Sequence, residues 1–99
     1  FLLNNYFIYI FSIIYMNKNK PIKSNRKNKK FSVISPKGKQ IHYGDTRYKD
    51  FTQHGDKKRQ ASYCKRAAGI TNKKGQKTFN NPETANYYAY KHLWLCNKL

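Results

Sequence analysis

The chain has 99 residues, and its 21 Lys and Arg side chains outnumber its 4 Asp and Glu side chains, giving a formal net charge of +17 at pH 7. This length accommodates one domain at most, and a core of this size contributes only about 3–5 kcal/mol of net stability. Helix caps and buried hydrogen bonds should therefore matter more than usual. The charge excess opposes compaction and favours a polyanionic partner, either nucleic acid or an acidic membrane face.

Residues 1–15 are uncharged and largely apolar, and the composition becomes lysine-rich after Met16. A signal peptide would need a basic segment before the apolar run and a small-residue cleavage site after it, and both are missing. A spanning helix needs about 20 apolar residues, more than this run provides. We expect residues 1–15 to be a spurious translation of AT-rich upstream sequence, although the lysines that follow would also suit a membrane anchor.

Residues 16–30 are predicted to form a disordered basic arm. Residues 17–30 hold seven basic side chains, no acid and a single apolar side chain, so this segment cannot bury a core. The arm would serve either as a solvated linker or as a nucleic-acid-binding or nuclear-import segment.

Residues 31–99 are predicted to form a small single α+β domain that starts with a β-hairpin. The β-prone runs at 31–35 and 39–43 are separated by a turn that contains Pro36 and Gly38. We expect the strand to end at Gly44 and Asp45, and residues 44–55 to form a loop.

Two helices should follow the hairpin. Asp56 is an N-cap residue for a helix over residues 57–68, and Gly69 would end that helix in the left-handed conformation. The polar segment after this helix is predicted to be an exposed loop. A second helix would begin near Thr84, reach Cys96 and pack a broad apolar face on the hairpin and the first helix.

Three of the four acidic residues lie within residues 44–60, and two roles are possible for them, one catalytic and one structural. As oxygen ligands of Mg²⁺, with His54 nearby, they would form a nuclease centre, but their spacing matches no recognised catalytic pattern. As structural groups, Asp45 would close a turn and Asp56 would cap the helix. Asp50 would pair with Arg47 or Arg59. The sequence favours the structural reading. The three acids are Asp45, Asp50 and Asp56.

Four side chains are of the types that bind zinc: His54, Cys64, His92 and Cys96. His92 and Cys96 are four residues apart on the second helix, a spacing that can hold a metal. There is no Cys-x-x-Cys pair, however, and a buried free cysteine often acts as a small apolar side chain. We expect no metal and reduced thiols, with a disulfide left open by the sequence.

Nine Tyr and one Trp in a basic chain could stack on the bases of single-stranded nucleic acid. Most of them fall on predicted strand and helix faces, where packing explains them. Tyr48 and Phe51 lie in the basic loop beside Arg47 and Lys49, so they are the better stacking candidates.

Three segments of the chain, in the order in which they occur, resemble those of a family of small, uncharacterised basic proteins from large eukaryotic DNA viruses and some bacteriophages. Within the resemblance, Tyr88 stands where Trp is expected and Lys58 where a second Arg is common. The family implies a viral context but no activity, because none is assigned to it. The segments are "SPKGKQIHYGDTRYKDFTQH" (35–54), "DKKRQASYCKRAAGITNKKGQKT" (56–78) and "NPETANYYAYKHLWL" (81–95).

The leading hypothesis is a non-enzymatic, virus-associated protein that binds DNA or RNA through phosphate contacts. Little sequence specificity is expected, because no base-reading motif is evident. We expect no cofactor and no membrane partner, and a location in the virion or in the host nucleus or cytoplasm rather than secretion. The predicted binding residues are Lys27, Lys29, Lys30, Arg47, Lys57, Lys58, Arg59, Lys65 and Arg66.

Two alternatives stay open. One is a minor structural or scaffold protein that docks an acidic protein partner, with Tyr87, Tyr90 and Trp94 as anchors if they are exposed. The other is the metal-dependent nuclease described above.

Overall fold

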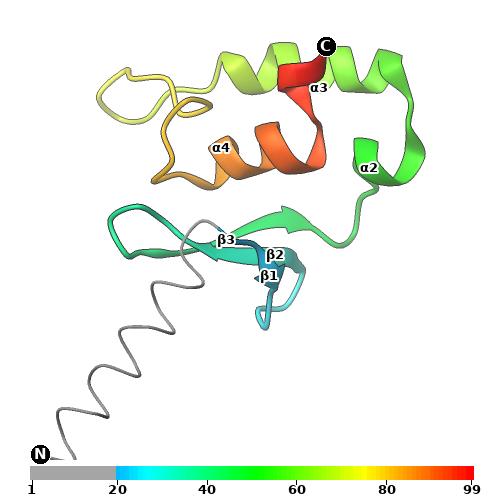
Figure 1. Cartoon of the computed structure of the whole chain (residues 1–99). Helices are drawn as coiled ribbons and strands as arrows, with labels where there is room; N and C mark the ends of the chain where they lie inside the picture. The colour runs from blue at the N-terminus through cyan, green and yellow to red at the C-terminus, as the bar shows by residue number, and fades with distance from the viewer. Residues whose placement is uncertain (1–19) are drawn as a thin grey trace, which may run out of the picture.

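The computed structural model describes residues 20–99, which form an antiparallel three-stranded sheet followed by helices (Figure 1). The predicted α+β class, with a hairpin ahead of helices, is confirmed. The predictions for residues 1–15 and for residues 16–19 lie outside the described residues. The elements are β1 (Ile22–Lys23), β2 (Lys29–Ile34), β3 (Gln40–Asp45), α2 (Phe51–His54), α3 (Lys57–Ala68), α4 (Ala85–Tyr88), the π-helical turn η1 (Ala89–Leu93) and the 3₁₀ turn η2 (Cys96–Lys98).

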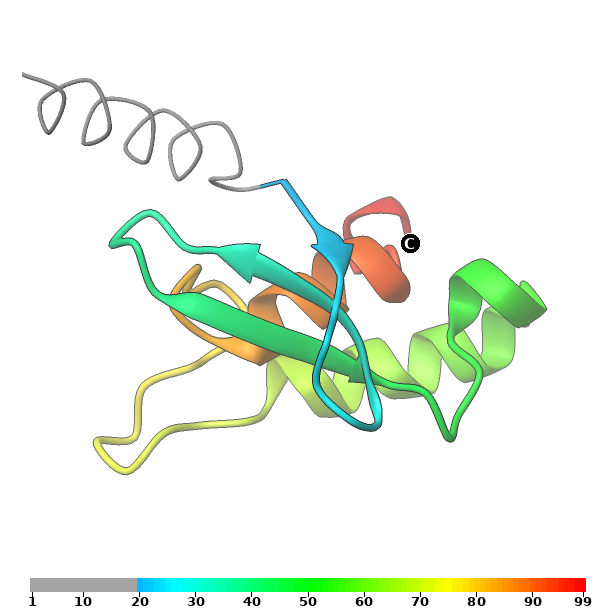
Figure 2. The same ribbon diagram turned by 90° about the horizontal axis from the view of Figure 1, so that it is seen from below.

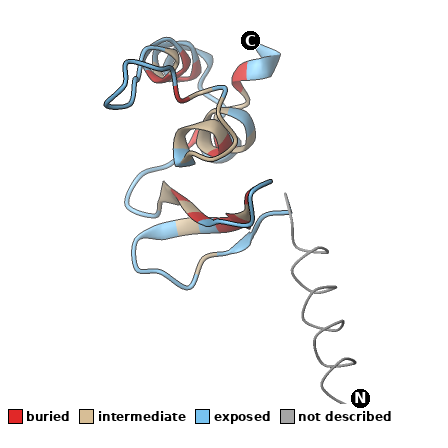
Figure 3. Cartoon of the chain, turned by 90° about the vertical axis from the view of Figure 1, so that its left-hand side faces the viewer, coloured by how far each residue is buried: buried red, intermediate tan, exposed pale blue. Residues whose placement is uncertain are grey.

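The elements stack in three layers, with α4 and η1 between the sheet and α3 (Figures 1 and 3). Seen from the sheet side, the helices lie behind the strands and α2 stands beyond the end of β3 (Figure 2). The core lies between the sheet and the middle layer. It consists of Val33, Ile41 and Tyr43 from the strands and Tyr88 and Leu93 from α4 and η1.

The predicted hairpin is formed by β2 and β3. Val33 pairs with Ile41 across the two strands, and both side chains are buried. The turn closes when the Ser35 N–H donates to the Lys39 carbonyl at 2.8 Å. Gly38 has a φ of 83° in this turn, a left-handed conformation that glycine adopts without a steric penalty.

The predicted disordered arm is wrong for residues 22–30, because part of that segment forms a third strand. Ile22 pairs with Ser32, and Lys23 with Phe31, so β1 extends the sheet on its outer edge. Ser24 then hydrogen-bonds the ring of His42 (Oγ to Nδ1, 2.7 Å). Composition indicated correctly that this segment buries little apolar surface. An edge strand needs mainly backbone hydrogen bonds, which composition does not reveal.

Helix α3 has the boundaries that the sequence predicted. The Asp56 carboxylate accepts hydrogen bonds from the backbone N–H groups of Lys58 and Arg59, as an N-cap should. The predicted left-handed cap at Gly69 is wrong, since its φ is −89°. The helix ends instead in a tighter turn, where the Gly69 N–H donates to the Arg66 carbonyl at 3.1 Å.

Helix α2 occupies part of the segment that was predicted to be a loop. Asp50 and Gln53 form a reciprocal capping box at its start, and Gly55 ends it with a φ of 64°. A single helical turn has too few residues to show apolar periodicity, so only the cap signals its presence. Those cap residues fix the approach of the chain to α3.

The C-terminal segment departs from the predicted continuous helix. The helix begins after Thr84, close to the predicted start, and the Thr84 side chain caps it. The hydrogen bonds then widen to a π-helical turn after Tyr88, and Leu95 adopts a φ of 47°. Cys96 then forms a disulfide with Cys64 of α3, which corrects the expectation of reduced thiols. No helix among residues 20–99 has the length and apolar character needed to cross a membrane.

Candidate nucleic-acid interface

A groove of about 700 Å³ opens between the end of the hairpin, the loop after β3, α3 and the η1 turn. Six basic and two acidic side chains line it, together with three aromatic rings. The lining residues are Lys29, Lys30, Gly44, Asp45, Tyr48, Lys49, Asp50, Lys58, Arg59, Ser62, Tyr63, Arg66, Ala89, Leu93 and Trp94.

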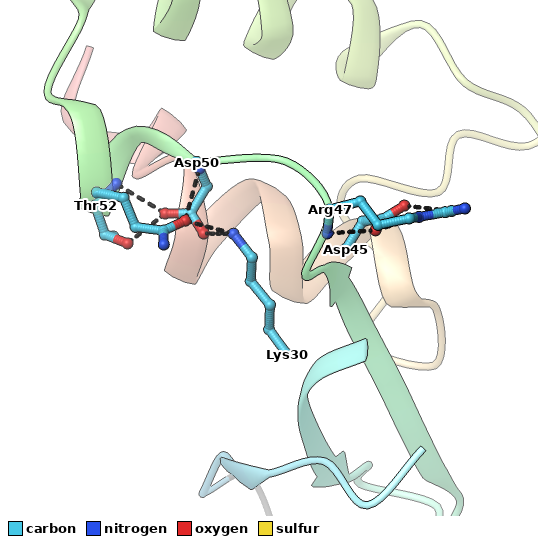
Figure 4. A network of polar contacts seen from close by, with 6 residues as sticks. Lys30, Asp45, Arg47, Asp50 and Thr52 are labelled. Atoms are coloured by element: carbon cyan, nitrogen blue, oxygen red, sulfur yellow. Dashed lines mark hydrogen bonds and ion pairs between the residues drawn. The ribbon is translucent and has the colours of Figure 1, made fainter. Parts of the chain in front are cut away.

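The sheet side of the groove depends on a buried ion pair. Lys30 Nζ lies 2.5 Å from Asp50 Oδ2, and it also donates to Gln53 Oε1 at 2.6 Å. Asp50 additionally accepts from the backbone N–H of Thr52 at 2.9 Å and from the Thr52 hydroxyl (Figure 4). The predicted partners of Asp50, Arg47 and Arg59, are therefore wrong. The true partner lay in the segment that was expected to be disordered.

The rim beside it carries a second ion pair, which is local and exposed. Arg47 binds Asp45 through two donors, Nε to Oδ1 at 3.0 Å and Nη2 to Oδ2 at 2.8 Å (Figure 4). These side-chain hydrogen bonds, with one from the Arg47 backbone, lower the pKa of Asp45 from 3.8 to about 2. The carboxylate therefore stays ionised and offsets one positive charge at this edge, as the predicted turn-closing role requires.

The helix side of the groove is formed by one face of α3. Lys58, Arg59 and Arg66 are exposed and line the groove, with Ser62 and Tyr63 between them. Lys58 and Arg66 are eight residues apart, so their backbones are separated by about 12 Å along the helix axis. This face therefore presents a row of positive charge opposite the sheet.

The aromatic rings that line the groove differ in how much they contact other side chains of the protein. Tyr63 stacks on Trp94 with ring centroids 4.2 Å apart and an interplanar angle of 9°. The Arg66 guanidinium lies 5.6 Å from the centre of the Tyr63 ring. Burial raises the pKa of the Tyr63 hydroxyl, so it remains protonated at neutral pH. Tyr48, in contrast, is 69% exposed on the rim.

Close approach of the backbone at Gly44 gives the floor of the groove its shape. Gly44 has a φ of 80°, and a Cβ atom there would lie 2.8 Å from Leu93 Cδ1. Any other residue would therefore be strained at this φ, and its Cβ would force the Leu93 side chain to shift. Gly44 keeps the sheet and the middle helical layer in contact below the basic walls.

The structure brings five of the nine predicted binding residues into the groove and leaves four outside it. Those that line it are Lys29, Lys30, Lys58, Arg59 and Arg66, and those that do not are Lys27, Arg47, Lys57 and Lys65. Lys30 is a special case, because its charge is already paired with Asp50. The sequence reading omitted Lys49, Tyr63 and Trp94 from the site. One signal in the sequence could have revealed Tyr63. Its spacing from the basic residues Lys58, Arg59 and Arg66 places all four side chains on one face of α3.

The side chains proposed for a nuclease or zinc centre do not gather into a metal site in the described part of the chain. His54 Nδ1 accepts the backbone N–H of Asp56 at 2.9 Å, and its Nε2 is buried without a hydrogen-bond partner among these residues. Asp50 is held by Lys30, and Cys64 is consumed in the disulfide. No group of three or more His, Cys, Asp or Glu side chains within residues 20–99 is arranged to hold a metal ion.

Comparison with known proteins gives one similarity. Residues 20–67 match the model of a family of unknown function (DUF5754). The match begins just before β1 and ends inside α3, so it covers the whole sheet and much of the basic helix face. The comparisons with curated proteins and with solved structures found no match.

Proposed function

We propose that the chain binds nucleic acid without sequence specificity, through phosphate contacts made by the groove. The observation that supports this most strongly is the placement of basic side chains on both walls of one concave surface. Lys29 and Lys49 stand on the sheet side, and Lys58, Arg59 and Arg66 face them from α3. A phosphate backbone lying in the groove would meet cations on both sides.

The charge balance of the groove agrees with this proposal. Both of its acids, Asp45 and Asp50, are already held by basic partners. The unpaired basic side chains of the lining therefore dominate the local field. Lys and Arg at phosphates release condensed counterions, which supplies affinity regardless of base sequence. The resemblance to proteins of large DNA viruses would make viral nucleic acid the partner, and this association is part of the proposal.

The test compares two triple variants with the same change in charge. K58Q/R59Q/R66Q removes three cations from the groove, while K73Q/K74Q/K77Q removes three exposed lysines that do not line it. The groove variant should bind DNA of any sequence about tenfold or more weakly at low salt, and the slope of log affinity on log salt should fall by about 1 per lost contact. Equal losses in the two variants would contradict a localised site.

The alternative of a scaffold protein with an acidic partner receives less support. Its proposed anchors were Tyr87, Tyr90 and Trp94, but Trp94 is stacked on Tyr63, and Tyr90 packs against Phe79 with ring centroids 5.1 Å apart. Aromatic anchors at interfaces need a free face to enter a pocket of the partner. The basic groove, rather than the aromatic stripe, is the surface that a partner would meet.

A further inference from the structure

The aromatic part of the groove lining is not explained by phosphate contacts alone. We propose that the groove binds single-stranded nucleic acid in preference to duplex, with an unpaired base stacked on Tyr48 and phosphates held by the basic walls on either side. This inference rests on the proposed function and specifies its substrate class.

Tyr48 is the ring that the fold leaves free. It is 69% exposed at the mouth of the groove, and among residues 20–99 it packs against no other aromatic ring. Its hydroxyl has no hydrogen-bond partner among the same residues, and its backbone N–H bonds the Asp45 carbonyl at 3.2 Å, which fixes the turn that carries it. A large exposed aromatic side chain on a fixed turn is therefore available to a ligand.

The other two rings of the groove support this assignment by contrast. Tyr63 and Trp94 have stacked on each other, and Arg66 lies over the Tyr63 ring. Their faces are used within the protein, so they form a firm apolar wall instead of a binding platform. A base would enter beside that wall and find the ring of Tyr48 as its stacking partner.

Stacking on Tyr48 is what would favour single strands over duplexes. Bases in a duplex stack on their own neighbours, so a ring stacks on them only where they are unpaired. In this groove Lys49 adjoins Tyr48 on the rim, and Arg59 and Arg66 line the facing wall. A strand with its bases turned inward would place phosphates near both walls. The volume of about 700 Å³ lies in the range of sites that enclose drug-sized ligands.

The experiment measures the affinity of the full chain for four probes at low salt. These are a labelled oligothymidine of about 12 nucleotides, an abasic oligomer with the same number of phosphates, a duplex of the same length and a polyglutamate peptide. Each is measured with the wild-type chain, Y48A and Y48F. The abasic oligomer keeps the phosphates and lacks the bases, so it isolates the stacking contribution.

We expect the wild-type chain to bind oligothymidine about fivefold or more tightly than the abasic oligomer or the duplex, because stacking on one ring adds about that much. Y48A should remove this advantage and leave the abasic affinity unchanged, while Y48F should retain it. Equal affinity for the three nucleic acids, unaffected by Y48A, would overturn the inference and leave phosphate binding intact. Binding to none of them, or tighter binding to polyglutamate, would overturn the proposed function as well.

Discussion

Two aspartates at the ends of the loop between β3 and α2, Asp45 and Asp50, each hold one basic side chain, but they do so in different surroundings. The Lys30 and Asp50 side chains are only 12% and 5% exposed, and the two residues are 20 positions apart. The Arg47 and Asp45 side chains are 65% and 33% exposed, and the two residues are 2 positions apart. One pair joins the sheet to the short helix α2, while the other only closes a turn on the rim.

The comparison shows that one residue type serves two purposes in this loop. A buried charge is expensive to leave unpaired, so the Lys30–Asp50 pair makes the position of α2 depend on β2. An exposed pair contributes little to stability, so Asp45 can be changed without disturbing the fold. Its main effect is to lower the positive potential at the mouth of the groove.

The largest effect is expected for Asp50→Ala. This change leaves the Lys30 ammonium without its carboxylate and removes the cap of α2, so the free energy of unfolding should fall by about 2–3 kcal/mol. Urea unfolding checks it. The double variant K30M/D50L, which removes both charges, should be more stable than Asp50→Ala alone. A loss below about 1 kcal/mol for Asp50→Ala would show that the pair does not anchor the loop.

A smaller effect is expected on nucleic-acid affinity for Asp45→Asn. The substitution removes a negative charge from the groove lining and frees Arg47, so affinity should rise about two- to fivefold at low salt. Glu83→Gln is the matched control, since it makes the same charge change at a side chain that binds Ser35 and Lys37 away from the groove. A rise of equal size in both variants would mean that net charge alone governs binding.

The smallest effect concerns acid stability. The pKa of Asp45 is lowered from 3.8 to about 2 by its hydrogen bonds to Arg47, so the folded state binds its proton less readily than the unfolded state does. The stability that the ionised Asp45 carboxylate gives to the folded state is therefore present above about pH 4 and is lost as the pH falls toward 2. Wild type should therefore be slightly more stable than Asp45→Asn at pH 7, and the difference should shrink as the pH falls through about 2. A difference that stays constant with pH would contradict this linkage.

Local signals in the sequence predicted the local parts of the fold. Pro36 and Gly38 marked the hairpin turn, and Asp56 marked the start of α3, because these residues act on their immediate neighbours. The Lys30–Asp50 pair and the Cys64–Cys96 disulfide join segments 20 and 32 positions apart, so no local pattern revealed them. The edge strand β1 was missed for another reason: its pairing with β2 depends on backbone hydrogen bonds, which composition does not reveal.

The candidate site was predicted in part. Lys58, Arg59 and Arg66 followed from charge on a helix with clear boundaries. The groove itself arises where α3, η1 and the end of β3 meet, and that meeting depends on the close packing of Gly44 on Leu93. Which basic residues face a common space is therefore a tertiary property, and Lys57 and Lys65 on the same helix lie outside it.

The most direct test of the binding groove is a titration of the full chain with single-stranded oligonucleotide, followed residue by residue through backbone amide chemical shifts. We expect the exposed turn with Lys73 and Lys74 to change little. The largest changes should fall on the groove residues Tyr48, Lys49, Arg59 and Arg66. Changes spread over all lysines in proportion to exposure, or centred on that turn, would contradict a binding groove.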